Sequence, residues 1–227
     1  MKKPYIVCHM MTSVDGRIDC AMTEYLPGTD DYYRTLESFD APTRVSGRVT
    51  AQLEMAKDGV FESETRTPYG KEGYSKALDA EGYEVVIDTK GTLLWDDQAQ
   101  EKRPLLVVTS EGVSQEYLRY LDNLHISWIA CGKETVDLAR ACELLADAFR
   151  VERMAVVGGG HINAGFLKAG LLDEISLLIG AGIDGRGGMC AVFDGLPMDY
   201  PVTPLRLNKV EMLDSGAVWI KYLVTSD

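Results

Sequence analysis

Three consecutive glycines, Gly158 to Gly160, follow an apolar run and precede a segment with helical character. Glycine loses more backbone freedom on folding than any other residue, so a triplet marks unusual dihedrals or a close approach by another group. A helix that begins there presents unpaired N–H groups and the positive end of its dipole, and both favour phosphate. The segment "VVGGGHIN" is therefore a candidate phosphate-binding loop, with a tight strand-to-helix corner as the alternative. Its candidate ligand-binding residues are Gly158, Gly159, Gly160, His161, Ile162 and Asn163.

The loop carries neither of the two common nucleotide-binding motifs. It lacks the G-x-G-x-x-G spacing of dinucleotide-binding folds, and the chain contains no G-x-x-x-x-G-K-[ST] segment. The glycines alone therefore leave the ligand open between a dinucleotide and a sugar phosphate.

Three other apolar runs end in residues that suit a phosphorylated ligand. These residues are Thr12 and Ser13 before the turn Asp15-Gly16, then Gly47, Arg48 and Thr50, and finally Thr109 and Ser110. In an open parallel sheet, ligands bind at the carboxyl ends of the strands. We therefore expect these groups and the glycine loop to serve one long, multiply phosphorylated ligand.

The elements that must position these residues follow from the apolar pattern. Strands are predicted at 5–11, 43–47, 83–88, 104–110, 126–130, 153–158 and 174–180, and helices at 30–39, 114–124, 134–149 and 162–170. Several strand runs are apolar without alternation, which is typical of parallel strands covered on both faces. Thr29 and Ser114 are the predicted N-caps, and Gly170 the predicted helix stop. The segment 205–224 predicts an antiparallel hairpin, and 57–82 predicts a loop or an active-site flap.

The length and composition of the chain limit the classes of protein to which it can belong. The 227 residues predict one α/β domain over 1–227, and a net charge of −12 argues against nucleic acid or an anionic membrane as partner. Five scattered cysteines without a C-x-x-C pair, and three histidines without paired spacing, indicate neither a disulfide framework nor a metal site. No apolar segment is long enough to span a bilayer, so a cytoplasmic protein is expected.

Together, "PYIVCHMMTSVDGRI", "GRVT" and "VVGGGHINAGFLKAGLLDEISLLIGAGIDG" resemble the reductase domain of bacterial riboflavin biosynthesis proteins, the RibD C-terminal domain. The S-x-D-G turn, the glycine triplet and the following D-E-[IL] strand stand in the order typical of that family. The resemblance spans nearly the whole chain and is weakest over 57–82. No deaminase signature accompanies it.

The resemblance implies a dihydrofolate reductase-like three-layer α/β/α sandwich, with a mostly parallel sheet and the antiparallel C-terminal hairpin, usually a homodimer. It implies NADPH as cofactor and reduction of a ribosylamino to a ribitylamino group on a 5-phosphorylated aminopyrimidine. By position, Thr12 would face the nicotinamide, Gly47, Arg48, Thr50 and Ser110 would contact the cofactor, and Gly159 to Gly165 would wrap its pyrophosphate. Thr109, Ser110 or a nearby arginine would meet the 2′-phosphate. Adjacent glycines of this superfamily can carry a cis peptide.

The substrate side departs from the family pattern at two positions. Relatives usually carry lysine where His9 stands and glutamate where Val157 stands; these positions and Ser13 would line the substrate. His9 is a candidate proton donor or a neutral packed histidine. Asp15 is a second catalytic candidate, with ordering of the Asp-Gly turn as the alternative. These departures keep two other functions open: an NADPH reductase of a pterin, imine or carbonyl compound, and a non-catalytic nucleotide-binding protein.

Overall fold

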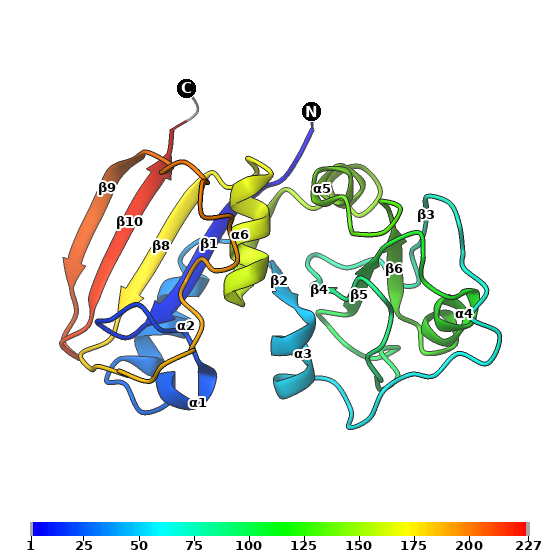
Figure 1. Cartoon of the computed structure of the whole chain (residues 1–227), viewed down its shortest axis with the longest axis horizontal. Coiled ribbons are helices and arrows are strands. Elements are labelled where there is room, and N and C mark those ends of the chain that lie inside the picture. The colour runs from blue at the N-terminus through cyan, green and yellow to red at the C-terminus, as the bar shows by residue number, and fades with distance from the viewer. Residues whose placement is uncertain (1, 226–227) are drawn as a thin grey trace. The chain divides into compact units, whose positions relative to one another are not determined.

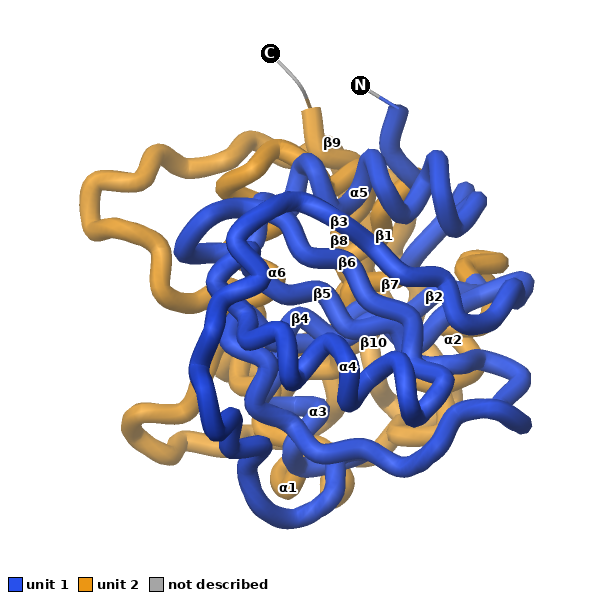
Figure 2. The backbone as a smooth tube through the Cα atoms, turned by 90° about the vertical axis from the view of Figure 1, so that its right-hand side faces the viewer, with its two compact units in different colours: residues 1–4, 42–154 blue, residues 5–41, 155–227 orange. Residues whose placement is uncertain are grey.

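The computed structural model describes residues 2–225, and they form the mixed α/β fold that the sequence predicts (Figure 1). The chain divides into two compact units, coloured separately in Figure 2. The first unit comprises the residues up to Pro4 and Pro42–Met154, and the second comprises Tyr5–Ala41 and the residues from Ala155 onward.

The first unit is built on five strands in the order β3-β6-β5-β4-β2. These are β2 (Thr43–Gly47), β3 (Gly73–Ser75), β4 (Glu84–Ile87), β5 (Leu105–Thr109) and β6 (Ser127–Ala130); the helices are α3 (Arg48–Glu54), α4 (Gln115–Asn123) and α5 (Leu138–Asp147). The pairs β2–β4, β4–β5 and β5–β6 are parallel, whereas β3 runs antiparallel to β6. The four parallel strands therefore end at one edge.

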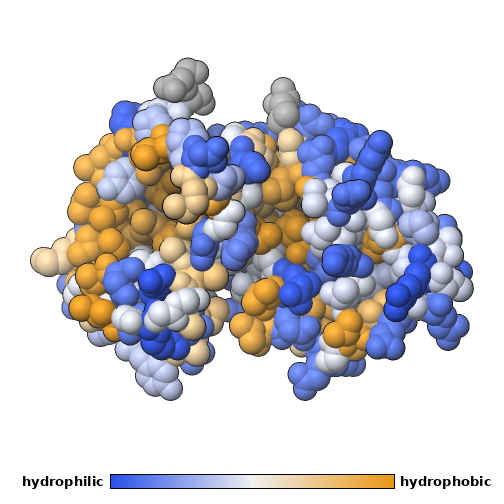
Figure 3. Space-filling model, viewed as in Figure 1, coloured by the Kyte–Doolittle hydropathy of each residue, from blue (hydrophilic) through white to orange (hydrophobic). Residues whose placement is uncertain are grey.

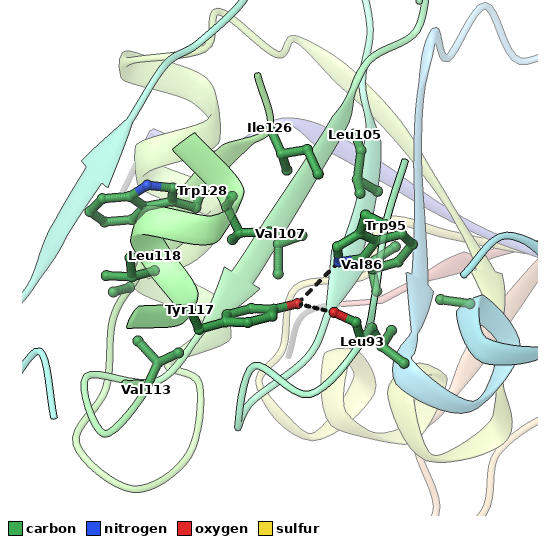
Figure 4. Packing of buried hydrophobic residues seen from close by; sticks show 13 residues of the cluster. Val86, Leu93, Trp95, Leu105, Val107, Val113, Tyr117, Leu118, Ile126 and Trp128 are labelled. Atoms are coloured by element: carbon green, nitrogen blue, oxygen red, sulfur yellow. Dashed lines mark hydrogen bonds between the residues drawn. The ribbon is translucent and has the colours of Figure 1, made fainter. Parts of the chain in front are cut away.

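The core of the first unit lies on the face of the sheet that α3 and α4 cover (Figure 4). Tyr117 of α4 is fully buried there, and its hydroxyl donates to the Leu93 carbonyl and accepts from the Trp95 indole, both at 3.0 Å. On the opposite face, Phe149, which follows α5, packs edge-on against Tyr83. The parallel strands are thus covered on both faces, which explains their uninterrupted apolar runs.

The second unit has strand order β7-β1-β8-β10-β9. The elements are β1 (Tyr5–Thr12), β7 (Arg153–Gly158), β8 (Glu174–Ile179), β9 (Leu205–Met212), β10 (Val218–Val224), α1 (Cys20–Thr23), α2 (Thr29–Glu37) and α6 (Gly160–Lys168). Strands β1 and β8 are parallel, and the predicted hairpin adds β10 and β9 antiparallel. Helix α2 covers the face that carries His9, and α6 covers the other, since its Leu167 lines a groove with Ile175.

Most predicted boundaries are confirmed to within one or two residues, and the exceptions have local causes. Ser114 caps α4 by accepting from the Tyr117 N–H, and Gly170 follows α6 at φ +65°. The Thr29 cap is wrong: Gly28 is the N-cap, and the Thr29 hydroxyl donates backwards to Thr23 and Leu26 carbonyls. Helix α5 begins at 138 instead of 134, because Asp137 accepts from the Arg140 N–H.

Helix α3 lies outside the ranges predicted from the sequence, and two shorter elements were not predicted either. Helix α1 has four residues, and β3 has three residues inside the segment predicted as a loop. β3 exists because it pairs with β6, and neither element is long enough to show a periodic pattern.

Candidate functional site

The glycine loop joins β7 to α6 in the second unit. Gly158 ends β7 at φ +139°, a conformation that favours glycine, and the Gly158–Gly159 peptide is cis. Gly159 is the N-cap of α6 and offers no side chain to cap it, and its carbonyl accepts the first helical hydrogen bonds, from the Ile162 and Asn163 N–H groups. The helix N-terminus therefore stands where the sequence predicts it, without an internal anionic or hydroxyl cap.

Gly160 has a packing reason of its own. A Cβ at this position would lie 2.4 Å from the Ala191 carbonyl oxygen, far inside van der Waals contact. The Asp194 N–H donates to the Gly160 carbonyl at 3.2 Å, and the buried Asn163 amide donates to the Val192 carbonyl at 2.7 Å. The segment 191–194 thus packs on the first turn of α6. The alternative interpretation of the glycines, a tight corner between strand and helix, therefore explains Gly160 and the burial of Asn163.

The remaining two residues of the loop differ in exposure. His161 is exposed, and its ring lies beside Gly195, where a Cβ would be 2.7 Å from the imidazole. Ile162 is half-buried, as is Val157, which precedes the loop on β7. His161 therefore borders both the glycine loop and the irregular segment that follows β8.

The turn after β1 is held by one carboxylate. Asp15 accepts from the Ser13 hydroxyl at 2.7 Å and from the backbone N–H groups of Asp184 and Gly185 at 3.0 Å. These hydrogen bonds, that of Ser13 foremost, lower the pKa of Asp15 to about 2. The carboxyl is therefore ionised at neutral pH and suits a turn anchor better than a proton donor. Thr12, the last residue of β1, is buried.

His9 lies in the middle of β1 and is completely buried. Its Nδ1 is 2.9 Å from the Ser176 hydroxyl, and its Nε2 is 3.2 Å from both the Tyr32 carbonyl and the Thr35 hydroxyl. The imidazole stacks on the Tyr32 ring at 4.8 Å and 10°. These contacts hold α2 against the sheet and favour the packed histidine over the proton donor.

The Tyr32 carbonyl can only accept, so the hydrogen bond at Nε2 requires a proton on that nitrogen of His9. In a neutral imidazole Nδ1 then accepts from the Ser176 hydroxyl, which itself accepts from the Trp219 indole at 2.7 Å. The neutral Nε2–H tautomer then donates towards α2. This chain of donors is satisfied without a charge on the imidazole.

The first unit contributes a second group of predicted residues, at the carboxyl edge of its parallel strands. The register places Gly47 opposite Ile87, and Thr109 opposite Ala130, so the strand ends align. Gly47 is the N-cap of α3, Arg48 is exposed, and Thr50 is half-buried. Gly47, Arg48, Thr50, Thr109 and Ser110 therefore share one edge, as predicted.

The two hydroxyls at the end of β5, of Thr109 and Ser110, are buried and already donate to carbonyl groups of the chain. Ser110 Oγ donates to the Thr89 carbonyl at 3.0 Å, and Thr109 Oγ1 donates to the Ser110 carbonyl at 3.2 Å. An anionic ligand needs hydrogen-bond donors, and both of these hydroxyl protons are already engaged. The exposed Arg48 is therefore the predicted residue of this unit best placed to donate to an anion.

One buried carboxylate at this edge was not predicted. Asp88 directly follows β4 and accepts from the backbone N–H groups of Thr92 and Leu93 at 2.6 and 2.9 Å. It shapes the turn beside Ser110, whose N–H also bonds to Thr89. The sequence feature that could have indicated this carboxylate is an aspartate at the end of the apolar run 83–88.

The comparisons with known proteins agree with this architecture. The structure resembles a pyrimidine reductase-like protein from Corynebacterium diphtheriae, with TM-score 0.70 and 17% identity over 99% of this chain and 93% of that one. It also resembles RibD from Acinetobacter baumannii (0.68, 17%, 98% of this chain, 58% of that one) and the riboflavin biosynthesis reductase Rib7 of Saccharomyces cerevisiae (0.61, 16%, 98% and 90%). At these identities the likeness shows the fold, which is that of pyrimidine reductase-like proteins.

The family follows from the sequence itself. The model of the RibD C-terminal domain matches residues 4–219, and the chain therefore belongs to this family. The match includes segments of both units and supports an oxidoreductase of the pyrimidine reductase type. Among residues 2–225, no helix is long and apolar enough to cross a membrane, and no group of three acidic, histidine or cysteine side chains could hold a metal ion.

Proposed function

We propose that this chain is an NADPH-dependent reductase of riboflavin biosynthesis that converts the ribosylamino group of a 5-phosphorylated aminopyrimidine into a ribitylamino group. The observation that carries the proposal is the glycine loop at the start of α6, which has no capping side chain and lies in a chain of the RibD C-terminal family. Such a helix start can bind a diphosphate through its backbone N–H groups. The bound cofactor would supply the hydride.

The proposed role of each residue depends on the unit in which it lies, at the carboxyl ends of that unit's strands. In the second unit, Gly158 to Asn163 would hold the pyrophosphate, Thr12 would face the nicotinamide, and Ser13 and Val157 would border the substrate. In the first unit, Gly47, Arg48, Thr50, Thr109 and Ser110 would hold the rest of the cofactor. Placing the reactive carbon beside the nicotinamide and excluding water would be the main contribution of the protein. We propose that both units act as one reductase domain.

His9 and Asp15 take supporting roles in this proposal. His9 would fix α2 on the sheet, because both its ring nitrogens face protein atoms. Asp15 would order the turn that presents Ser13, because its carboxylate accepts from Ser13 and from the segment at 184–185.

The burial of His9 also favours a second candidate function. A side chain with no exposed surface cannot hold a substrate in the way the lysine of relatives would. A reductase that acts on another small imine, carbonyl or pterin compound is therefore the alternative. Turnover of the ribosylamino pyrimidine with NADPH separates the two, because the alternative predicts cofactor binding without that reaction.

The Gly159→Asp substitution tests the glycine loop. A carboxylate at the α6 N-cap would occupy the place of the phosphate and repel it, so we expect NADPH to bind at least tenfold more weakly, about 1.4 kcal/mol. Ala169→Asp is the matched control, since it adds the same charge at the other end of α6, where the exposed C-cap Ala169 has an ordinary helical φ of −78°. If folded Gly159→Asp protein binds NADPH as tightly as the control, the loop assignment is wrong.

A further inference from the structure

One irregular segment of the second unit contacts two of its predicted ligand-binding elements. Residues 182–195 follow the end of β8 and reach the start of α6 (Figure 1). We call these residues the linking segment. The two elements that it contacts are the turn after β1, which presents Ser13, and the glycine loop, Gly158 to Gly160.

The first part of the linking segment is held by the turn after β1. The Val14 N–H donates to the Gly182 carbonyl at 2.8 Å. The Arg186 guanidinium donates to the Asp19 carboxylate at 2.6 Å. These contacts add to the two backbone hydrogen bonds that Asp15 accepts from this segment. The linking segment therefore follows the turn closely.

Arg17 joins the turn to the middle of the linking segment. Its N–H donates to the Ser13 hydroxyl at 3.1 Å, and its carbonyl accepts from the Ser13 N–H at 3.0 Å. Its guanidinium donates to the Met189 carbonyl at 2.6 Å, and its backbone forms an antiparallel bridge with Ala191. One arginine therefore contacts Ser13 and two residues of the linking segment.

The end of the linking segment is held by the first turn of α6. Ala191 lies opposite Arg17, and its carbonyl oxygen is the atom that a Cβ at Gly160 would meet at 2.4 Å. Directly after it, the Val192 carbonyl accepts from the buried Asn163 amide at 2.7 Å. Ala191 is therefore in contact with both ligand-binding elements at once.

The linking segment has little apolar burial to hold it in place. The structure describes all of its residues, and among them Val192 alone is fully buried. Figure 3 shows mainly hydrophilic and neutral side chains over this part of the unit. Five of its residues are glycines, which lose the most backbone freedom on ordering. Segments of this kind open locally at a low cost in free energy, so the order of this one depends on the polar contacts at both ends.

We propose that the linking segment, with Arg17 as its positioning residue, couples the Ser13 turn to the glycine loop. A diphosphate at the start of α6 would order the segment and, through Ala191 and Arg17, the turn that presents Ser13. A substrate at Ser13 would in turn tighten dinucleotide binding, because coupling between two sites is reciprocal. The role in ligand binding rests on the proposed function, whereas the coupling of the two elements does not.

Hydrogen exchange of the intact protein, followed by mass spectrometry, tests the coupling without a ligand. Arg17→Met removes the donor to the Met189 carbonyl, so exchange should rise at least tenfold in residues 182–190 and also in the peptide that contains Asp194, whose N–H bonds to α6. Arg17→Lys can still donate to that carbonyl and should restore most of the protection. Arg119→Met is the matched control, the same change at an exposed arginine of α4, and should leave exchange in both regions unchanged.

A second variant perturbs the segment from the other end. Asn163→Ala removes the amide that donates to the Val192 carbonyl, so exchange of the Asp184 and Gly185 N–H groups should also rise at least tenfold. If either folded variant speeds exchange only at the end of the segment where the substitution lies, the two elements are independent and the proposal is overturned.

Addition of NADPH to the unmodified protein separates this proposal from the proposed function. The coupling predicts slower exchange in residues 12–18 as well as in 158–164. Slower exchange in 158–164 alone would overturn the coupling, although the cofactor binds. If NADPH changes exchange nowhere, the proposed function fails, and the ligand-free variants alone then confirm or overturn the coupling.

Discussion

Removing the His9 side chain is expected to destabilise the second unit without acting on chemistry. His9→Ala deletes a fully buried ring and leaves the Ser176 hydroxyl without its acceptor. Truncation of a large buried side chain costs about 2–5 kcal/mol, and an orphaned buried polar group about 1–3 kcal/mol. Since part of the cavity can relax, we expect a loss of about 3–5 kcal/mol, or roughly 10 °C in Tm for a chain of this length.

The assay is thermal unfolding, run in parallel with NADPH binding and with turnover per folded molecule. His9→Gln is the informative partner variant, because its amide can still accept from Ser176 and donate towards the Tyr32 carbonyl. We expect His9→Gln to recover most of the lost stability and to retain activity, which an amide could not do as a proton donor. An unchanged Tm in His9→Ala, together with loss of turnover in both variants, would refute the packing role.

Three further substitutions test the turn, the glycine loop and the half-buried Glu84. Asp15→Asn should loosen the segment at 184–185, measured as faster tryptic cleavage after the exposed Arg186; an unchanged cleavage rate would contradict the anchor role. Gly160→Val should cost about 1–3 kcal/mol in urea unfolding, because its side chain would collide with the carbonyl at 191, and a neutral result would rule out that contact. Burial raises the pKa of Glu84 to about 7, so folding favours the protonated carboxyl. The stability that this carboxyl contributes is lost as the pH rises from about 4.5 to 7. Glu84→Gln should therefore stabilise the protein at pH 8 by at most about 3 kcal/mol, measured as a higher Tm, and much less at pH 4. Equal effects at the two pH values would contradict the burial argument.

The parts of the fold that could be predicted from sequence are those set by local pattern. The run "RMAVVG" is a strand with the predicted bounds, because apolar residues covered on both faces leave little other choice. Gly170 ends α6 because only the left-handed region closes that turn, and glycine adopts it without strain. Ser114 caps α4 for an equally local reason, since its hydroxyl needs only the N–H three residues on.

The parts that could not be predicted depend on contacts between distant segments. The two interpretations of His9 could not be separated, because Ser176 lies 167 residues further along the chain. Gly160 looked like a ligand-binding glycine, and only the fold brings the Ala191 carbonyl against it. Thr29 had the right residue type for a cap, but Gly28 at φ +103° took that place. In each case the residue type suggested a role, whereas tertiary packing determined the contacts that the residue makes.

Titration with nicotinamide dinucleotides would show whether the glycine loop belongs to a cofactor site. The purified protein would be titrated with NADPH and, separately, with NADH, and binding followed by nicotinamide fluorescence. We expect saturable NADPH binding, at least tenfold tighter than that of NADH. Failure of both dinucleotides to bind would contradict it, because the loop would then hold another phosphate or serve only as the corner between β7 and α6.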